Sequence, residues 1–134
     1  MKGEHEFVAL LVFIAIGAVV LCYSYGDDEP ERVRIHRVID GDTVTYKGSR
    51  GEEKRVRLLG IDTPERGDKG YQEAKDYLSR RVAGQTVTLK KQGVDVYGRE
   101  LADMYDKHGW VNEDLLDEGH AEKYQRRKRK KRWL

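Results

Sequence analysis

The sequence predicts an α+β domain, mainly β, in which a five-stranded barrel packs against helices and follows an N-terminal hydrophobic helix. Short segments in which apolar and polar residues alternate recur at close spacing, which is typical of half-buried strands. A stretch with apolar residues three and four positions apart interrupts them, and glycine-containing loops separate them. This order suits a small, partly open barrel such as the OB type, although other α+β folds share the same spacing.

The first strand is predicted from residue 32 onwards, where Val33 and Ile35 alternate with charged residues. Two adjacent apolar residues, Val38 and Ile39, then break the alternation. Such a break predicts a β-bulge, or a switch of face, just before the Asp-Gly dipeptide that follows.

The second and third strands are predicted at residues 43–46 and 54–61, joined by a loop that holds two glycines and a serine. Because side chains alternate along a strand, Val56 and Leu58 are expected on the face opposite Arg57. The arginine is therefore expected on the other face from these two apolar residues.

The next segment has helical spacing and is predicted to form a helix that stops at Gly84. The apolar residues on this spacing are Tyr71, Ala74, Leu78 and Val82. Two further strands are predicted at residues 86–90 and 99–105. Asn112 is then expected to cap a short second helix. The predicted order is thus three strands, a helix, two strands and a helix.

The 134 residues leave room for one domain with appendages, and their charge is unevenly distributed. Seven of the 26 basic residues lie together at 126–132, and the rest of the chain is mildly acidic. The single cysteine, Cys22, excludes an intramolecular disulfide and any multi-cysteine metal site. We divide the chain into an N-terminal hydrophobic segment, an acidic linker, a folded domain and a basic tail: 1–26, 27–31, 32–125 and 126–134.

Residues 7–23 are uncharged and mostly apolar, and as a helix they would be roughly 25 Å long, at the short end of what spans a bilayer. An uncleaved membrane anchor is the first interpretation. A cleaved signal peptide, whose apolar region is about 7–15 residues long, is the second, and a buried helix is the third. Positive charge is almost absent just after the segment, which favours a location of the domain outside the cytoplasm. The predicted localisation is therefore membrane-anchored outside the cytoplasm, or secreted if the segment is cleaved.

Four motifs along the chain resemble, in the same order, those of the staphylococcal nuclease-like (thermonuclease) family. They are Asp-Gly-Asp-Thr at 40–43, Arg-Leu-Leu-Gly-Ile-Asp-Thr-Pro-Glu at 57–65, Tyr-Gly-Arg at 97–99 and Val-Asn-Glu at 111–113. The resemblance covers residues 33–124. It implies an OB-fold barrel with packed helices and a calcium-dependent phosphodiesterase that cleaves DNA and RNA and leaves 3′-phosphate ends.

The acidic motifs contain the candidate metal ligands. Calcium takes six to eight oxygen ligands, which carboxylates and backbone carbonyls supply. The resemblance implies that Asp42 and Asp62 bind the ion together with the carbonyl of Thr63. Asp40 is expected just outside the ligands, and Thr43 is expected to shape the metal loop.

The resemblance also implies the catalytic residues. Arg57 and Arg99 are the expected phosphate ligands, because a guanidinium matches two phosphate oxygens at once and stays charged. Glu65 is expected to position or deprotonate the attacking water. Tyr97, Tyr124 and Tyr105 are weaker candidates for stacking on bases, and packing in the core or at its rim is the stronger interpretation for each.

The expected partners are DNA and RNA substrates, and the membrane through residues 7–23 if they are not cleaved. The protein is expected to act as a monomer. The basic run at 126–132 has two interpretations, a solvated tail or an arm that follows the phosphates of a substrate. The alternative function is a non-catalytic nuclease-like module that binds nucleic acid or protein. Such modules are expected to lose the metal carboxylates or the arginines, and this chain retains them.

Overall fold

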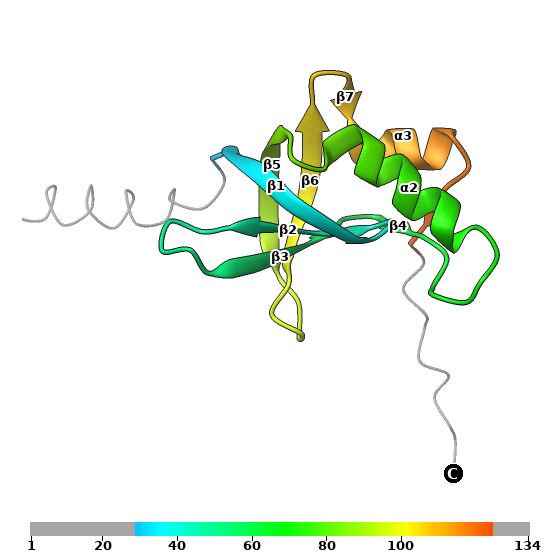
Figure 1. Ribbon diagram of the computed structural model, residues 1–134, viewed down its shortest axis with the longest axis horizontal. Helices are drawn as coiled ribbons and strands as arrows, with labels where there is room; N and C mark the ends of the chain where they lie inside the picture. Colours follow the sequence, from blue (N-terminus) through cyan, green and yellow to red (C-terminus); the bar gives the residue numbers. More distant parts are fainter. Residues whose placement is uncertain (1–28, 125–134) are drawn as a thin grey trace, which may run out of the picture.

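The computed structural model describes residues 29–124, which form a closed five-stranded β-barrel with two helices (Figure 1). Neighbouring strands follow the order β3-β2-β1-β5-β6, and a parallel pairing between β3 and β6 closes the barrel. The predicted α+β, OB-type class is confirmed. The barrel strands are β1 Glu31–Asp40, β2 Thr43–Lys47, β3 Glu53–Leu58, β5 Thr86–Val94 and β6 Glu100–Asp106.

The remaining elements lie around the barrel. The helices are α2 Tyr71–Val82 and α3 Val111–Asp117, and the two-residue strands are β4 Ile61–Asp62, β7 Gly109–Trp110 and β8 Glu122–Lys123. These short strands were not predicted, because two residues cannot show an alternation. No helix within residues 29–124 has the length and hydropathy needed to cross a bilayer. The hydrophobic helix predicted over residues 7–23, and the basic run at 126–132, lie outside the described residues.

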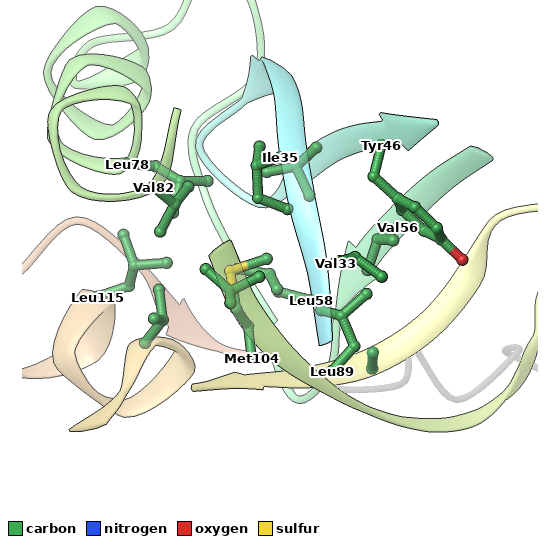
Figure 2. Packing of buried hydrophobic residues seen from close by; sticks show 14 of the residues in the cluster. Val33, Ile35, Tyr46, Val56, Leu58, Leu78, Val82, Leu89, Met104 and Leu115 are labelled. Atoms are coloured by element: carbon green, nitrogen blue, oxygen red, sulfur yellow. The ribbon is translucent and has the colours of Figure 1, made fainter. Parts of the chain in front are cut away.

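One continuous hydrophobic core joins the barrel interior to both helices (Figure 2). Strand residues at alternate positions, such as Val33 and Ile35, point into the barrel, as predicted. Helix α2 buries Tyr71, Ala74, Leu78 and Val82, which are the four residues that the helical spacing identified. Burial of these side chains, at about 1.5–3 kcal/mol for each large one, fixes α2 against β1, next to the ends of β1 and β4.

The register of β1 against β2 shifts twice, between Ile35 and Arg37 and again between Val38 and Asp40. The predicted bulge is therefore confirmed. A bulge increases the local twist of a strand and re-aims the side chains beyond it. Here the second shift comes immediately before Asp40, the last residue of β1, and the turn that carries Asp42.

The predicted single strand at residues 54–61 is wrong, because the chain bends at Leu59 and Gly60. Gly60 has φ of 72°, a left-handed conformation that a residue with a side chain adopts only with strain. After the bend, β4 leaves the barrel and pairs Ile61 with Lys123 of β8. The spacing of apolar residues does not reveal such a bend, because Ile61 is apolar and buried after the bend, as a strand residue can be.

The expectation that Asn112 caps the second helix is also wrong. Trp110 occupies the cap position, and no side chain makes a capping hydrogen bond. The Asn112 side chain is buried instead: its Oδ1 accepts the backbone N–H of Met104, and its Nδ2 donates to the carbonyl of Leu59. Asn112 thus ties α3 to β6 and to the chain just after β3, because a buried amide must satisfy its polar atoms.

An ion pair joins α2 to the end of β6. Arg81 donates from Nε to Asp106 Oδ2 over 2.6 Å and from Nη2 to Asp106 Oδ1 over 2.9 Å, and its Nη1 lies 2.6 Å from Asp114 of α3. Burial by itself would raise the pKa of the Asp106 carboxyl. The hydrogen bonds from Arg81 and from the N–H of His108 outweigh burial and hold this pKa below its ordinary value.

Asp106→Asn is expected to lower the free energy of unfolding by about 2–3 kcal/mol at neutral pH, less than for a fully unpaired buried charge because Asp114 still pairs with Arg81. Since the folded pKa of Asp106 is depressed, its contribution is present above about pH 4 and is lost as the pH falls through the folded value. Urea unfolding from neutral to acidic pH should therefore show the two proteins converging at low pH. Asp117→Asn, at an exposed position of α3, serves as the control, and a constant difference at all pH values would contradict the explanation.

Candidate active site

Asp42 lies in the turn between β1 and β2. The Asp42 side chain is buried; its Oδ1 accepts the hydroxyl of Thr43 over 3.0 Å, and its Oδ2 accepts the backbone N–H of Thr63 over 3.2 Å. The backbone carbonyl of Asp42 also accepts the N–H of Leu58 over 2.9 Å. Asp42 therefore ties the turn after β1 to the end of β3 through its backbone carbonyl and to Thr63 through its carboxylate.

Gly41 allows this turn to pack closely against α2. A Cβ at this position would lie 2.8 Å from the Cβ of Ala74, which is too close, and 3.0 Å from the Oγ1 of Thr63, which is a tight contact. Beside it, Asp40 accepts the hydroxyl of Tyr71 over 2.8 Å. The Asp-Gly-Asp motif is therefore more than a turn signal: its glycine and its first carboxylate attach the turn to α2.

Arg57 lies between the two predicted metal carboxylates. Its Nη2 is 3.3 Å from Asp42 Oδ2 and 3.3 Å from Asp62 Oδ1, and its Nη1 donates to the carbonyl of Leu58 over 2.6 Å. The Arg57 and Asp42 side chains are largely buried, whereas that of Asp62 is 59% exposed. One nitrogen thus marks a point where two carboxylates converge and a positive charge is stabilised.

Arg99 approaches from the loop between β5 and β6, where Asp95 holds it. Asp95 Oδ1 accepts the backbone N–H groups of Tyr97 and Arg99, and its Oδ2 accepts Nε of Arg99 over 2.7 Å. Burial would raise the pKa of the Asp95 carboxyl, but these hydrogen bonds lower it below its ordinary value. Asp95 was not among the residues predicted from the sequence. Its place at the start of the turn ending in Tyr-Gly-Arg was the available signal, because Asp commonly accepts backbone N–H groups two residues on.

A cleft of about 490 Å³ brings most of the predicted residues together. Its predicted members are Asp40, Asp42, Arg57, Asp62, Thr63, Glu65 and Arg99, joined by Ile39, Pro64 and Arg66. Thr43 does not line the cleft and acts only through its hydrogen bond to Asp42. Residues from three of the four motifs therefore form one site, and the motif at 111–113 does not line it.

Tyr97 and Tyr124 line a second cleft of about 500 Å³, which Arg57 and Arg99 also line. The two tyrosine side chains are 81% and 57% exposed. The guanidinium carbon of Arg99 lies 5.4 Å from the centre of the Tyr97 ring. The N–H of Tyr124 donates to the carbonyl of Gly60, which places this tyrosine beside the bend after β3. The two arginines thus stand between an acidic cleft and a more apolar one.

Comparison with known proteins identifies the family. The model described as "Staphylococcal nuclease homologue" matches residues 55–133, more than half of the chain. The chain belongs to the staphylococcal nuclease family. As a member of this family it is a hydrolase of the nuclease class, and such enzymes are generally metal-dependent.

Curated relatives agree with this assignment. An uncharacterised endonuclease of Escherichia coli O157:H7 is 33% identical over 122 residues, which cover 90% of this chain and 74% of that protein. The thermonuclease of Staphylococcus intermedius is 32% identical over 130 residues, which cover 83% of this chain and 77% of the relative. A micrococcal nuclease of Shigella flexneri is 36% identical over 88 residues, which cover 66% of this chain and 50% of that protein.

The chemistry of the cleft limits the kind of ion that this member of the family can hold. Asp42 and Asp62 offer carboxylate oxygens, and no histidine or cysteine lines the cleft. In the part of the chain from residue 29 to 124, no three His, Cys, Asp or Glu side chains are grouped to hold a metal. The donor set therefore fits a hard cation that completes its shell with backbone, water and substrate oxygens, as calcium and magnesium do.

Asp95→Asn is expected to lower kcat about tenfold with little change in thermal stability. The amide oxygen still accepts the two N–H groups of the turn, but the charged acceptor of Arg99 Nε is lost, and a small misplacement of a catalytic group is costly. Steady-state kinetics, together with a thermal unfolding curve, measures both effects. A normal kcat in the folded variant would show that Arg99 does not depend on Asp95.

Proposed function

We propose that this protein is a calcium-dependent phosphodiesterase that hydrolyses DNA and RNA with little sequence specificity and leaves 3′-phosphate ends. One observation carries the proposal: Asp42 and Asp62 converge on Arg57 in a cleft that also contains Arg99 and Glu65. Metal-assisted phosphodiester hydrolysis needs hard oxygen donors for the ion, positively charged groups for the phosphate and a carboxylate that can act as a base. The aspartates, the two arginines and Glu65 provide them.

Asp42, Asp62 and the carbonyl of Thr63 would hold the calcium ion. Support comes from the two carboxylates, which already share a positive partner in Arg57 Nη2. The N–H of Thr63 binds Asp42, so the loop that carries the third ligand is tied to the first. When bound, the ion supplies Lewis-acid polarisation of a phosphoryl oxygen.

Arg57 and Arg99 bind the scissile phosphate in this proposal. They come from β3 and from the loop before β6, and both line the acidic cleft and the more apolar cleft next to it. Arg57 must exchange its contacts with Asp42 and Asp62 for phosphate oxygens, a change that a cation held by these two aspartates would favour. Fixed guanidinium groups then stabilise the charge that develops on the phosphoryl oxygens.

Glu65 accepts the proton of the attacking water. Its side chain is exposed in the cleft, two residues after Thr63, and its carbonyl is fixed by the N–H of Asp68 over 2.9 Å. Water then attacks phosphorus in line with the 5′ oxygen, and its proton passes to the Glu65 carboxylate. The bond from phosphorus to the 5′ oxygen breaks, and this oxygen takes a proton from solvent to leave as a hydroxyl.

The apolar cleft receives the base of the bound nucleotide, where Tyr97 and Tyr124 provide exposed rings. Stacking on aromatic rings tolerates every base, since each has a π-face. This explains the proposed lack of sequence specificity. No base-specific hydrogen bond is needed for the phosphate to reach the two arginines.

The test of the proposed function is a cleavage assay with the full-length protein. Single-stranded DNA and RNA are incubated with calcium, then with a chelator, and then with calcium restored. We expect cleavage of both substrates that stops with the chelator, returns with calcium and yields 3′-phosphate ends. Binding without cleavage under all conditions would instead support a non-catalytic module, and metal-independent cleavage would refute the calcium site.

We also propose that the protein acts as a monomer on the outer side of the cytoplasmic membrane, or in secreted form, with residues 7–23 as anchor or signal. The apolar character of this segment and the scarcity of positive charge after it support the proposal. Protease treatment of intact cells, followed by separation of membrane and medium, distinguishes the two locations. A protease-protected domain would contradict both.

A further inference from the structure

The outer face of the sheet formed by β1, β5, β6 and β7 carries a row of side chains that the active site does not use. Strand pairing places Arg32 opposite Thr88, Thr88 opposite Tyr105, and Tyr105 opposite Trp110. Residues paired across neighbouring strands point to the same face of a sheet. We call these four residues the aromatic row; it crosses four strands whose spacing gives a width of about 14 Å.

The two aromatic residues of the row are accessible. Their rings are nearly parallel, with an interplanar angle of 16° and centroids 6.3 Å apart. Tyr105 is 38% exposed and Trp110 is 40% exposed. Each ring therefore leaves apolar surface in contact with water, and covering this surface would be favourable. Indole Nε1 of Trp110 donates to Asp103 Oδ1 over 3.2 Å, which fixes the ring over the sheet.

Positive charge lies within the aromatic row and beside it. Arg32 and Arg34 project from β1 and Lys90 from β5, all three exposed. Within residues 29–124 none of these three side chains forms an ion pair with a carboxylate. The acidic member of this face, Asp103, accepts hydrogen bonds from Trp110, Gln92 and Asn112. Asp103 is also the strand neighbour of Lys90, so the face offers two unpaired arginines, and a lysine beside one carboxylate, next to flat rings.

We propose that this face is a second binding site for single-stranded nucleic acid, separate from the catalytic cleft. Bases stack on Tyr105 and Trp110, while Arg32, Arg34 and Lys90 contact phosphates. Aromatic rings beside a positively charged track are the two parts that single-strand binding surfaces combine, and the small Thr86 and Thr88 side chains leave room between them. The charge of the face is complementary to a polyphosphate.

The second site is well placed to hold a long substrate. Tyr105 lies six residues along β6 from Arg99, which corresponds to roughly 20 Å for an extended strand. In Figure 1, β7 and the β5–β6 loop that leads to Arg99 lie at opposite ends of β6. A short oligonucleotide cannot occupy both places, whereas a long one can. The site should therefore raise the affinity for long strands and leave short ones unaffected.

Anisotropy titrations of full-length protein in chelator test the second site. The probes are labelled single-stranded DNAs of about 4 and about 16 nucleotides, the range of site sizes of OB-type domains. We expect Tyr105→Leu/Trp110→Leu, and separately Arg32→Gln/Arg34→Gln, to raise the Kd of the longer probe about tenfold and to leave the shorter probe unchanged. Arg50→Gln/Arg55→Gln removes the same charge from exposed positions on the β2–β3 hairpin and should have little effect.

A second measurement needs no change in the sheet face. The chain has two tryptophans, so Trp133→Phe leaves Trp110 as the only one. We expect the longer probe to quench its fluorescence. Wild-type affinity in both sheet-face variants, or no quenching at saturation, would overturn the proposal. Loss of binding to phosphatidylserine vesicles with oligonucleotide binding intact would assign the face to a membrane instead.

This inference rests on the nucleic-acid substrate of the proposed function, but its test does not depend on catalysis. The titrations in chelator measure binding of the probe and do not require its cleavage. A protein that binds through the face and never cleaves would support the second site and refute the proposed activity. A protein that cleaves, but whose sheet-face variants bind the longer probe as the wild type does, would support the proposed activity and refute the second site.

Discussion

Arg57→Ala is expected to lower kcat/KM by about 10³-fold or more while the barrel stays folded. An arginine that stabilises the transition state of phosphoryl transfer contributes about 10³–10⁵-fold in comparable enzymes. Arg57 also lies between Asp42 and Asp62, so its loss removes the positive charge that separates them. Steady-state cleavage of single-stranded DNA, with circular dichroism to verify folding, measures the effect.

Two further variants show whether charge or geometry is responsible. Arg57→Lys keeps the charge but loses the planar fork, and we expect it to stay well below the wild-type rate. Arg55→Ala removes an exposed arginine two residues away on the same strand, and its rate should be normal. Near-normal turnover in Arg57→Ala would remove this residue from the mechanism.

The same variant also tests the metal site without catalysis. In Arg57→Ala without metal, Asp42 and Asp62 face each other with no cation between them, and their repulsion should lower the melting temperature at neutral pH. Calcium should then raise the melting temperature more in the variant than in the wild type, because ligand binding stabilises the folded state. An equal calcium effect in the two proteins would indicate that the ion binds elsewhere.

Glu65→Gln is expected to lower kcat by about 10²–10⁴-fold with little change in KM, which is the range for loss of a general base. The amide has the shape of the carboxylate but cannot accept the proton of water. The Glu65 side chain is exposed, so the substitution should leave the fold unchanged. Kinetics under calcium saturation separates kcat from KM.

Asp68→Asn is the matched control for Glu65. Asp68 is exposed three residues further on and lines the neighbouring pocket with Glu65, but it does not line the catalytic cleft. Its rate should be within about twofold of the wild type, as for most surface substitutions. If both variants lost the same activity, the effect would be that of the local negative charge and not of a base.

Most of the fold could be predicted because its signals are local. Alternation along β1 and helical spacing along α2 depend only on which residues face the core, so both were identified from the sequence. The errors occurred where a distant partner decides the structure. Gly60 bends the chain after β3 so that β4 can pair with β8, and Asn112 turns inward because Met104 and Leu59 offer partners for its amide.

The sequence by itself determined the chemical groups: two aspartates, two arginines and a glutamate in motifs of the staphylococcal nuclease family. It could not show that one nitrogen of Arg57 lies 3.3 Å from both Asp42 and Asp62, or that Asp95 orients Arg99. Only the tertiary structure decided these relations. The physical reason is that the parallel pairing of β3 with β6, a contact between segments far apart in the sequence, closes the barrel and brings three of the four motifs into one cleft.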